Sequence, residues 1–177
     1  MKKQELAQQL KIKHLEFIDF QSKLSEVDFL YAPTAQKWSA GQQLEHIIKS
    51  VSPLTQAFLL PNFALTLFFG KANRSSKTYP ELIEKYHSKL SQGGVASARF
   101  TPKVVTLKQR ENLLKTLSRL IEKLSKQLDN FSEEELDKLI LPHPLLGKIT
   151  LREMFYFTIY HVQHHHRLIL ETIKNRA

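Results

Sequence analysis

Four of the eight histidines in the chain lie close together, at His161, His164, His165 and His166. Imidazole nitrogens bind divalent metals, carry protons and form hydrogen bonds, so this cluster is the part of the sequence best suited to chemistry. Apolar residues recur around it at helical spacing. The four side chains must therefore be placed on a helix before their chemistry can be judged.

Helical geometry separates these histidines from one another. At about 100° per residue, His165 lies about 40° from His161 on the inward face, whereas His164 and His166 lie about 60° and 140° away from His161. Two imidazoles one turn apart can converge on a single ion. Hydrogen-bonded core histidines and a solvent-facing run remain open alternatives. The sequence is not HExxH, because Val162 follows His161, so the metalloprotease arrangement is absent.

His46 is the candidate for a third ligand. It lies about two turns into a predicted helix, between an apolar and a polar stripe. A metal site inside a helical bundle takes its ligands from facing helices, which requires such a position. Taken alone, the position favours a partly buried polar residue over a ligand. Of the other histidines, His14 can line a pocket from the first helix, and His87 and His143 lie in or near connections.

Helical periodicity dominates the whole chain. Long amphipathic helices are predicted at residues 3–27, 39–58, 106–128 and 151–174, and shorter ones at 80–90 and after Ser132. The pairs Ser39/Gln42 and Thr150/Glu153 have the spacing of capping boxes. Pro53 is expected to kink or restart its helix. No strand pattern competes, so the sequence predicts an all-α four-helix bundle with short extra helices in the connections, forming a single domain over residues 1–177.

Composition narrows the classes of protein and of metal site. Cysteine is absent, so any metal must be held by His, Asp or Glu, and the composition is compatible with the cytoplasm, where we expect the protein to act. The first ten residues lack the apolar core of a secretory signal. Residues 52–70 are apolar but interrupted by Pro53 and Pro61, which predicts a buried segment and no membrane span.

The charge balance is basic, with 26 Lys and Arg against 17 Asp and Glu, a net charge of +9. Such a balance can indicate nucleic-acid binding. The lysines are scattered among glutamates, however, and no block of like charges occurs. We therefore expect a solvated basic surface and no nucleic-acid partner.

Two motifs together resemble the DinB-like superfamily of helical-bundle proteins. They are KWSAGQQLEHI at residues 37–47 and HPLLGKITLREMFYFTIYHVQHHHRLI at residues 143–169. The resemblance implies a metal-dependent hydrolase or a thiol-dependent transferase, and it places the family's three metal-binding histidines at His46, His161 and His165. It also implies a homodimer. Residues 70–105 match nothing in the family and are expected to form part of a substrate pocket.

Three neutral imidazoles would leave a divalent ion its full charge and open coordination positions, the pattern of a catalytic site. Such an ion, which we expect to be Zn, Ni or Fe, can activate bound water or present a small thiol to an electrophile. The substrate would be a small molecule of unknown identity. No organic cofactor site is predicted. The alternative is a non-catalytic helical bundle that binds a small ligand or a protein partner.

The sequence does not identify a general base or any other catalytic side chain. Glu45 precedes His46 but points about 100° away from it. Gln42 lies one turn before His46, a position from which its side chain could hydrogen-bond a bound water or ligand. Trp38 is expected to pack at the start of its helix instead of contacting substrate.

Overall fold

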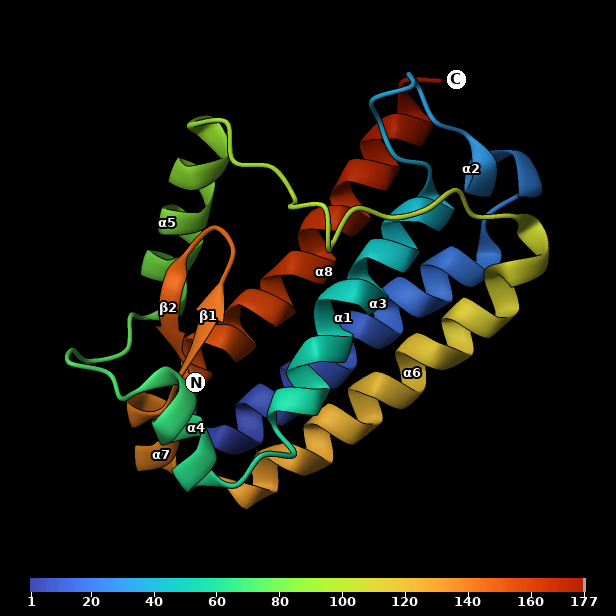
Figure 1. Cartoon of the computed structure of the whole chain (residues 1–177). Helices are drawn as coiled ribbons and strands as arrows, with labels where there is room; N and C mark the ends of the chain where they lie inside the picture. The colour runs from blue at the N-terminus through green and yellow to red at the C-terminus, as the bar shows by residue number, and fades with distance from the viewer. Residues whose placement is uncertain (177) are drawn as a thin grey trace.

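A computed structural model describes residues 1–176 of the chain, and this part is predominantly helical (Figure 1). The four longest helices are α1 (Lys3–Lys23), α3 (Ala40–Ala57), α6 (Arg110–Gln127) and α8 (Leu151–Lys174). The connections contain shorter elements: α2 (Glu26–Leu30), α4 (Asn62–Phe69), α5 (Tyr79–Ser91), α7 (Glu133–Lys138), the 3-10 turns Leu107–Gln109 and Leu128–Asn130, and the strands β1 (Ile140–His143) and β2 (Gly147–Thr150).

The four long helices lie side by side and enclose the main core (Figure 1). Helix α1 packs against α6 and α8, and α3 packs against the same two helices. Helix α5 crosses α8 on its outer side. The long helices were predicted because their apolar stripes must be buried, and each stripe does face the shared core.

The predicted capping boxes set the starts of the two helices that carry the candidate ligands. Ser39 accepts a hydrogen bond from the Gln42 amide, and Thr150 accepts one from the Glu153 amide. Each partner side chain reaches back to the cap backbone. Helix α3 continues through Pro53 to Ala57. Because the first residue of each helix is fixed in this way, the direction in which the histidines of α3 and α8 point from the helix axis is also set.

The first helix is shorter than predicted. It ends at Lys23, and Leu24 takes an extended conformation. Ser25 then caps α2 by accepting a hydrogen bond from the Asp28 amide. A serine followed three residues later by an aspartate favours the start of a new helix. The apolar pattern alone did not show this start.

The expectation that the chain has no strands was wrong. Strands β1 and β2 form an antiparallel hairpin in which Ile140 pairs with Thr150 and His143 with Gly147. Gly147 has a φ of 74°, which glycine adopts without strain. Each strand has four residues and no inside–outside alternation, so it gives no period-two signal. The hairpin leads directly into the capped start of α8.

The prediction that residues 52–70 are buried was wrong for much of the segment. Phe58 and Leu65 are buried, but Phe63 and Leu67 are each 75% exposed, and Leu59 and Phe68 are also exposed. Helix α4 is apolar except at Asn62 and Thr66, and its tertiary contacts lie mainly with β1. Hydrophobicity alone could not show which side of α4 would be covered.

None of the helices in residues 1–176 is by itself both long enough and apolar enough to cross a membrane.

Candidate metal centre

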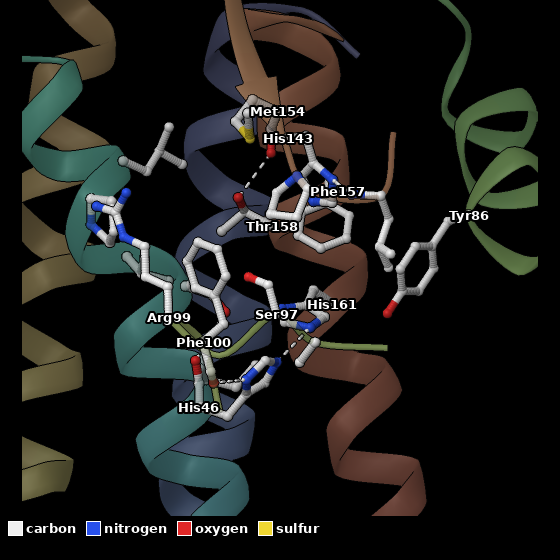
Figure 2. A pocket seen from close by; sticks show the side chains of 18 of the residues that line it. His46, Tyr86, Ser97, Arg99, Phe100, His143, Met154, Phe157, Thr158 and His161 are labelled. Carbon is white, nitrogen blue, oxygen red and sulfur yellow. Dashed lines mark hydrogen bonds between the residues drawn. The ribbon is translucent and has the colours of Figure 1, made fainter. Parts of the chain in front are cut away.

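The structure brings His46, His161 and His165 together in the core, between α3 and α8. The Nε2 atom of His161 lies 3.1 Å from Nε2 of His46 and 3.1 Å from Nε2 of His165. Figure 2 shows the His46 and His161 rings facing one another across the two helices. The three side chains are buried, and they form a group that could hold a metal ion.

A backbone carbonyl orients the His46 ring. Its Nδ1 lies 2.8 Å from the carbonyl oxygen of Phe100 (Figure 2). Because a carbonyl oxygen can only accept, Nδ1 must carry the proton. The Nε2 of neutral His46 therefore points a lone pair toward His161.

A glutamine that the sequence did not single out orients His165. The Nδ1 of His165 lies 3.0 Å from Oε1 of Gln43. The amide nitrogen of Gln43 donates to the Trp38 carbonyl, which fixes the oxygen on the side of His165. His165 Nδ1 is therefore the donor, and its Nε2 also offers a lone pair. Gln43 precedes His46 by one turn, but its role appears only once α8 packs against α3.

Burial keeps the three imidazoles neutral. It lowers the pKa of His161 and His165 well below the usual value, and neighbouring imidazoles lower it further. Burial also lowers the pKa of His46, although its bond to Phe100 opposes this shift. Neutral imidazole is the form that binds metals.

The donor set fits a divalent metal ion. The Nε2 lone pairs of His46 and His165 both face Nε2 of His161, which can meet them with its own N–H or, where a cation lies between the three nitrogens, with a third lone pair. Zinc bound tetrahedrally at 2.0–2.1 Å from two imidazole nitrogens would hold these nitrogens about 3.3 Å apart, close to the 3.1 Å found here. His46, His161 and His165 would hold the ion, without a thiolate or a carboxylate in the group.

Other residues near the cluster differ partly from expectation. Trp38 lies before the helix start but also stacks on the cluster, with its ring 4.9 Å from that of His46 and nearly parallel to that of His165. The capping role predicted for Gln42 is confirmed, because its side-chain oxygen accepts from the Ser39 backbone amide, and Gln42 is not among the residues that line the cavity beside the cluster. Glu45 points away, as expected, and accepts from the Lys103 amide.

A cavity of about 430 Å³ opens beside the three histidines. Its walls come from α1, α3, α5, α8, the hairpin and residues 95–100. The expectation that the region 70–105 helps form a pocket is thus confirmed by Tyr86, Ser97 and Phe100, which all line the cavity (Figure 2). Among residues 1–176, no Asp or Glu lines it, so no carboxylate base faces the cluster.

His14 also lines this cavity, as the sequence allowed. Its Nδ1 lies 2.8 Å from the Leu10 carbonyl, so Nδ1 carries the proton and Nε2 is an acceptor. No group within residues 1–176 hydrogen-bonds this buried Nε2. Burial lowers the pKa of His14 to about 4.

The remaining histidines lie outside the three-histidine group. His143 accepts from the Leu145 and Leu146 amides, and His87 contacts the Tyr160 hydroxyl at 2.6 Å. His166 packs on Phe20. His143 and His164 line the cavity without joining the group.

Comparison with known families accounts for this arrangement. The sequence model of the DinB superfamily matches residues 12–169, and the chain therefore belongs to that superfamily. The match includes all three clustered histidines. A search of curated proteins found no match to the chain.

Proposed function

We propose that this protein is a metal-dependent enzyme that uses His46, His161 and His165 to bind one divalent ion, Zn, Ni or Fe. Its reaction would be hydrolysis of a small molecule or transfer of a thiol to one. The observation that carries the proposal is the convergence of three neutral imidazoles beside a cavity of about 430 Å³. Membership of the DinB superfamily supports it.

The surrounding residues have distinct parts in this proposal. A bound ion would supply Lewis acidity and open coordination positions beside the cavity. The Phe100 carbonyl and Gln43 hold two of the rings in the tautomer that binds metal. Trp38 covers the cluster and limits the access of water. The apolar cavity walls hold the body of the substrate.

We further propose that α1, α3, α6 and α8 act as a four-helix bundle that fixes the metal site. Each of these helices packs against two of the others, which supports the proposal. The ligands would then come from two facing helices of the bundle, as is usual for metal sites of this kind.

Metal analysis of protein made without a histidine tag tests the proposal. The wild type should bind one equivalent of Zn or Ni after incubation, and His46→Ala and His161→Ala should lose it. His166→Ala is the matched control, because this neighbouring histidine packs on Phe20 away from the cluster and should leave metal content unchanged. Wild-type protein that stays metal-free after incubation would exclude the metal-dependent function.

Two assays distinguish the two reactions. Two reactions should be measured with metal-loaded wild type and with His161→Ala: the hydrolysis of p-nitrophenyl acetate, and the displacement of chloride from 1-chloro-2,4-dinitrobenzene by glutathione. Metal-dependent turnover in one assay, lost in His161→Ala, would identify the class of reaction.

A non-catalytic ligand-binding protein is the second candidate, favoured by the absence of a carboxylate among the cavity-lining residues in the described part of the chain. It predicts no metal-dependent turnover in either assay. Histidine substitutions would then alter stability or ligand affinity alone.

A further inference from the structure

The cavity beside the histidines contains one residue whose charge does not depend on pH. Arg99 lies in the wall formed by residues 95–100, and the cavity lining includes no Lys, Asp or Glu among residues 1–176. Figure 2 shows the Arg99 side chain on the α3 side of the cavity, away from Phe157 and His161 on α8. Arg99, itself exposed to solvent, thus adds a cation to an otherwise uncharged and mostly apolar wall.

The backbone around Arg99 is held in place relative to the metal centre. The Phe100 and Thr101 amides donate to the Ser97 carbonyl, which closes a tight turn around Arg99. The carbonyls of Phe100 and Thr101 accept from His46 and Lys49 of α3, at 2.8 and 2.7 Å. The turn that carries Arg99 therefore shares a hydrogen bond with a candidate metal ligand.

Arg99 has no anionic partner within the described residues. Its guanidinium lies 5.8 Å from the centre of the Phe100 ring, and it enters none of the ion pairs of residues 1–176. Arg74, Arg152 and Arg176, by contrast, all pair with carboxylates. A guanidinium beside an apolar cavity can form paired, charge-assisted hydrogen bonds with an incoming anion.

The remaining groups in the wall carry no negative charge that would oppose an anion. Burial lowers the pKa of the imidazoles of His14 and His143 to about 4, so these rings are neutral at pH 7. A metal ion at the three histidines would add positive charge. Apolar side chains including Val51, Leu54, Leu90 and Met154 supply most of the remaining surface.

We propose that the cavity binds an apolar organic anion, whose aliphatic or aromatic body lies against the apolar walls and whose anionic group pairs with Arg99. This inference names the substrate class for the proposed function and rests on it for the reaction. Binding itself requires only the cavity and Arg99, so it can be measured without a metal.

Three probes of equal length test the proposal on metal-free protein: 4-phenylbutyrate, the neutral 4-phenylbutan-1-ol and the cationic 4-phenylbutylamine. Trp38 is the sole tryptophan and lines the cavity, so its fluorescence reports binding at this site. We expect the butyrate to bind at least about tenfold more tightly than the alcohol, because of the charge-assisted hydrogen bonds, and the amine to bind most weakly.

Substitutions of Arg99 test whether this side chain causes the preference for the butyrate over the alcohol. Arg99→Met keeps an unbranched apolar chain but removes the guanidinium, and it should reduce the affinity for the butyrate to about that for the alcohol. Arg99→Lys keeps a positive charge and should retain part of the preference. Arg119→Met is the matched control, since Arg119 is exposed on α6 and outside the cavity lining. Circular dichroism of each variant checks that the fold is retained.

Equal affinity for the butyrate and the alcohol in the wild type would overturn the proposal. A preference retained in Arg99→Met, or no binding of any probe at millimolar concentration, would also overturn it. Metal content, measured on separate samples, decides the proposed metal-dependent function independently. If the protein binds the anion but takes up no metal, the proposed anion site is supported and the proposed metal-dependent function is excluded.

Discussion

The hydrogen bonds at Nδ1 determine what His46 and His165 can bind at Nε2. The Phe100 carbonyl and the Gln43 amide oxygen each require a proton on the ring nitrogen that they face. Both rings are thereby set in the tautomer that offers a lone pair to a metal. A substitution at these partners should therefore alter metal affinity without removing a ligand.

Two adjacent glutamines provide a test of this orienting role. Gln43→Leu should weaken Zn binding by about 10–100-fold, because His165 loses its acceptor. Gln42→Leu should remove half of a capping box, at a cost of about 0.3–1.5 kcal/mol in stability, with Zn affinity unchanged. Competition with a chelating dye measures the affinities. Equal losses of affinity in the two variants would contradict the orienting role of Gln43.

His14 should make the metal-free protein sensitive to acid. Its pKa falls from 6.5 in the unfolded chain to about 4 in the folded protein, so the unfolded state binds more protons between these values. Stability is therefore fully present above pH 6.5 and is lost as the pH falls toward 4, by up to about 3 kcal/mol from this residue.

Urea unfolding at several pH values measures this contribution. His14→Leu should flatten the fall in stability below pH 6.5, although His143 and His164, whose pKa values are also lowered to about 4, should preserve part of it. An unchanged pH dependence in His14→Leu would show that this histidine is not buried in the neutral form.

The candidate ligands could be predicted from sequence, but their supporting groups could not. Helical phase placed His161 and His165 on one inward face and made His46 the candidate for a third ligand, and the family resemblance implied the same three residues. Gln43 and the Phe100 carbonyl contact these rings only after distant segments pack together. No local pattern identifies such partners, because their hydrogen bonds depend on tertiary geometry.

Among the elements, the segment around α4 has buried and exposed aromatic side chains, and we expect them to contribute very differently to the stability of the fold. Phe58→Ala should cost about 3–5 kcal/mol, because this buried ring packs on Phe131 and Phe155. Phe63→Ala should change stability by less than about 0.5 kcal/mol, since its ring is exposed. Chemical denaturation compares the two. A large loss in Phe63→Ala would mean that this face of α4 is covered in solution.

The long helices were predictable from sequence, as were the shorter helices α5 and α7, whereas α2 and the two strands were not. Helix α8 has 24 residues and a capping box, so periodicity and cap agree on its bounds. The strands have four residues each, and α2 has five, too few to express a period. Their structure depends on turn residues such as Gly147 and on contacts with α3, α4 and α8.

For the whole molecule, the metal centre links two distant parts of the chain. His46 and His161 are 115 residues apart in sequence, so the unfolded chain cannot present the same group of ligands. An ion that binds the folded state alone stabilises it by mass action. At a free Zn concentration about 100 times Kd, the gain should be about 2.7 kcal/mol, which raises Tm by about 5–10 °C.

Calorimetry with and without Zn measures this stabilisation. The increase in Tm should vanish in His46→Ala and His161→Ala and persist in His166→Ala. An equal increase in all four proteins would place the stabilising ion elsewhere. The expected homodimer stays a prediction at this scale, and analytical ultracentrifugation checks it.

X-ray absorption spectroscopy of the Zn-loaded, tag-free protein can show whether the three imidazoles bind one ion. The account predicts three imidazole nitrogens about 2.0–2.1 Å from zinc, with oxygen in the remaining positions and no sulfur. The His161→Ala protein should lose this spectrum. Fewer than three imidazoles around zinc in the wild type, or the same spectrum in His161→Ala, would contradict the account.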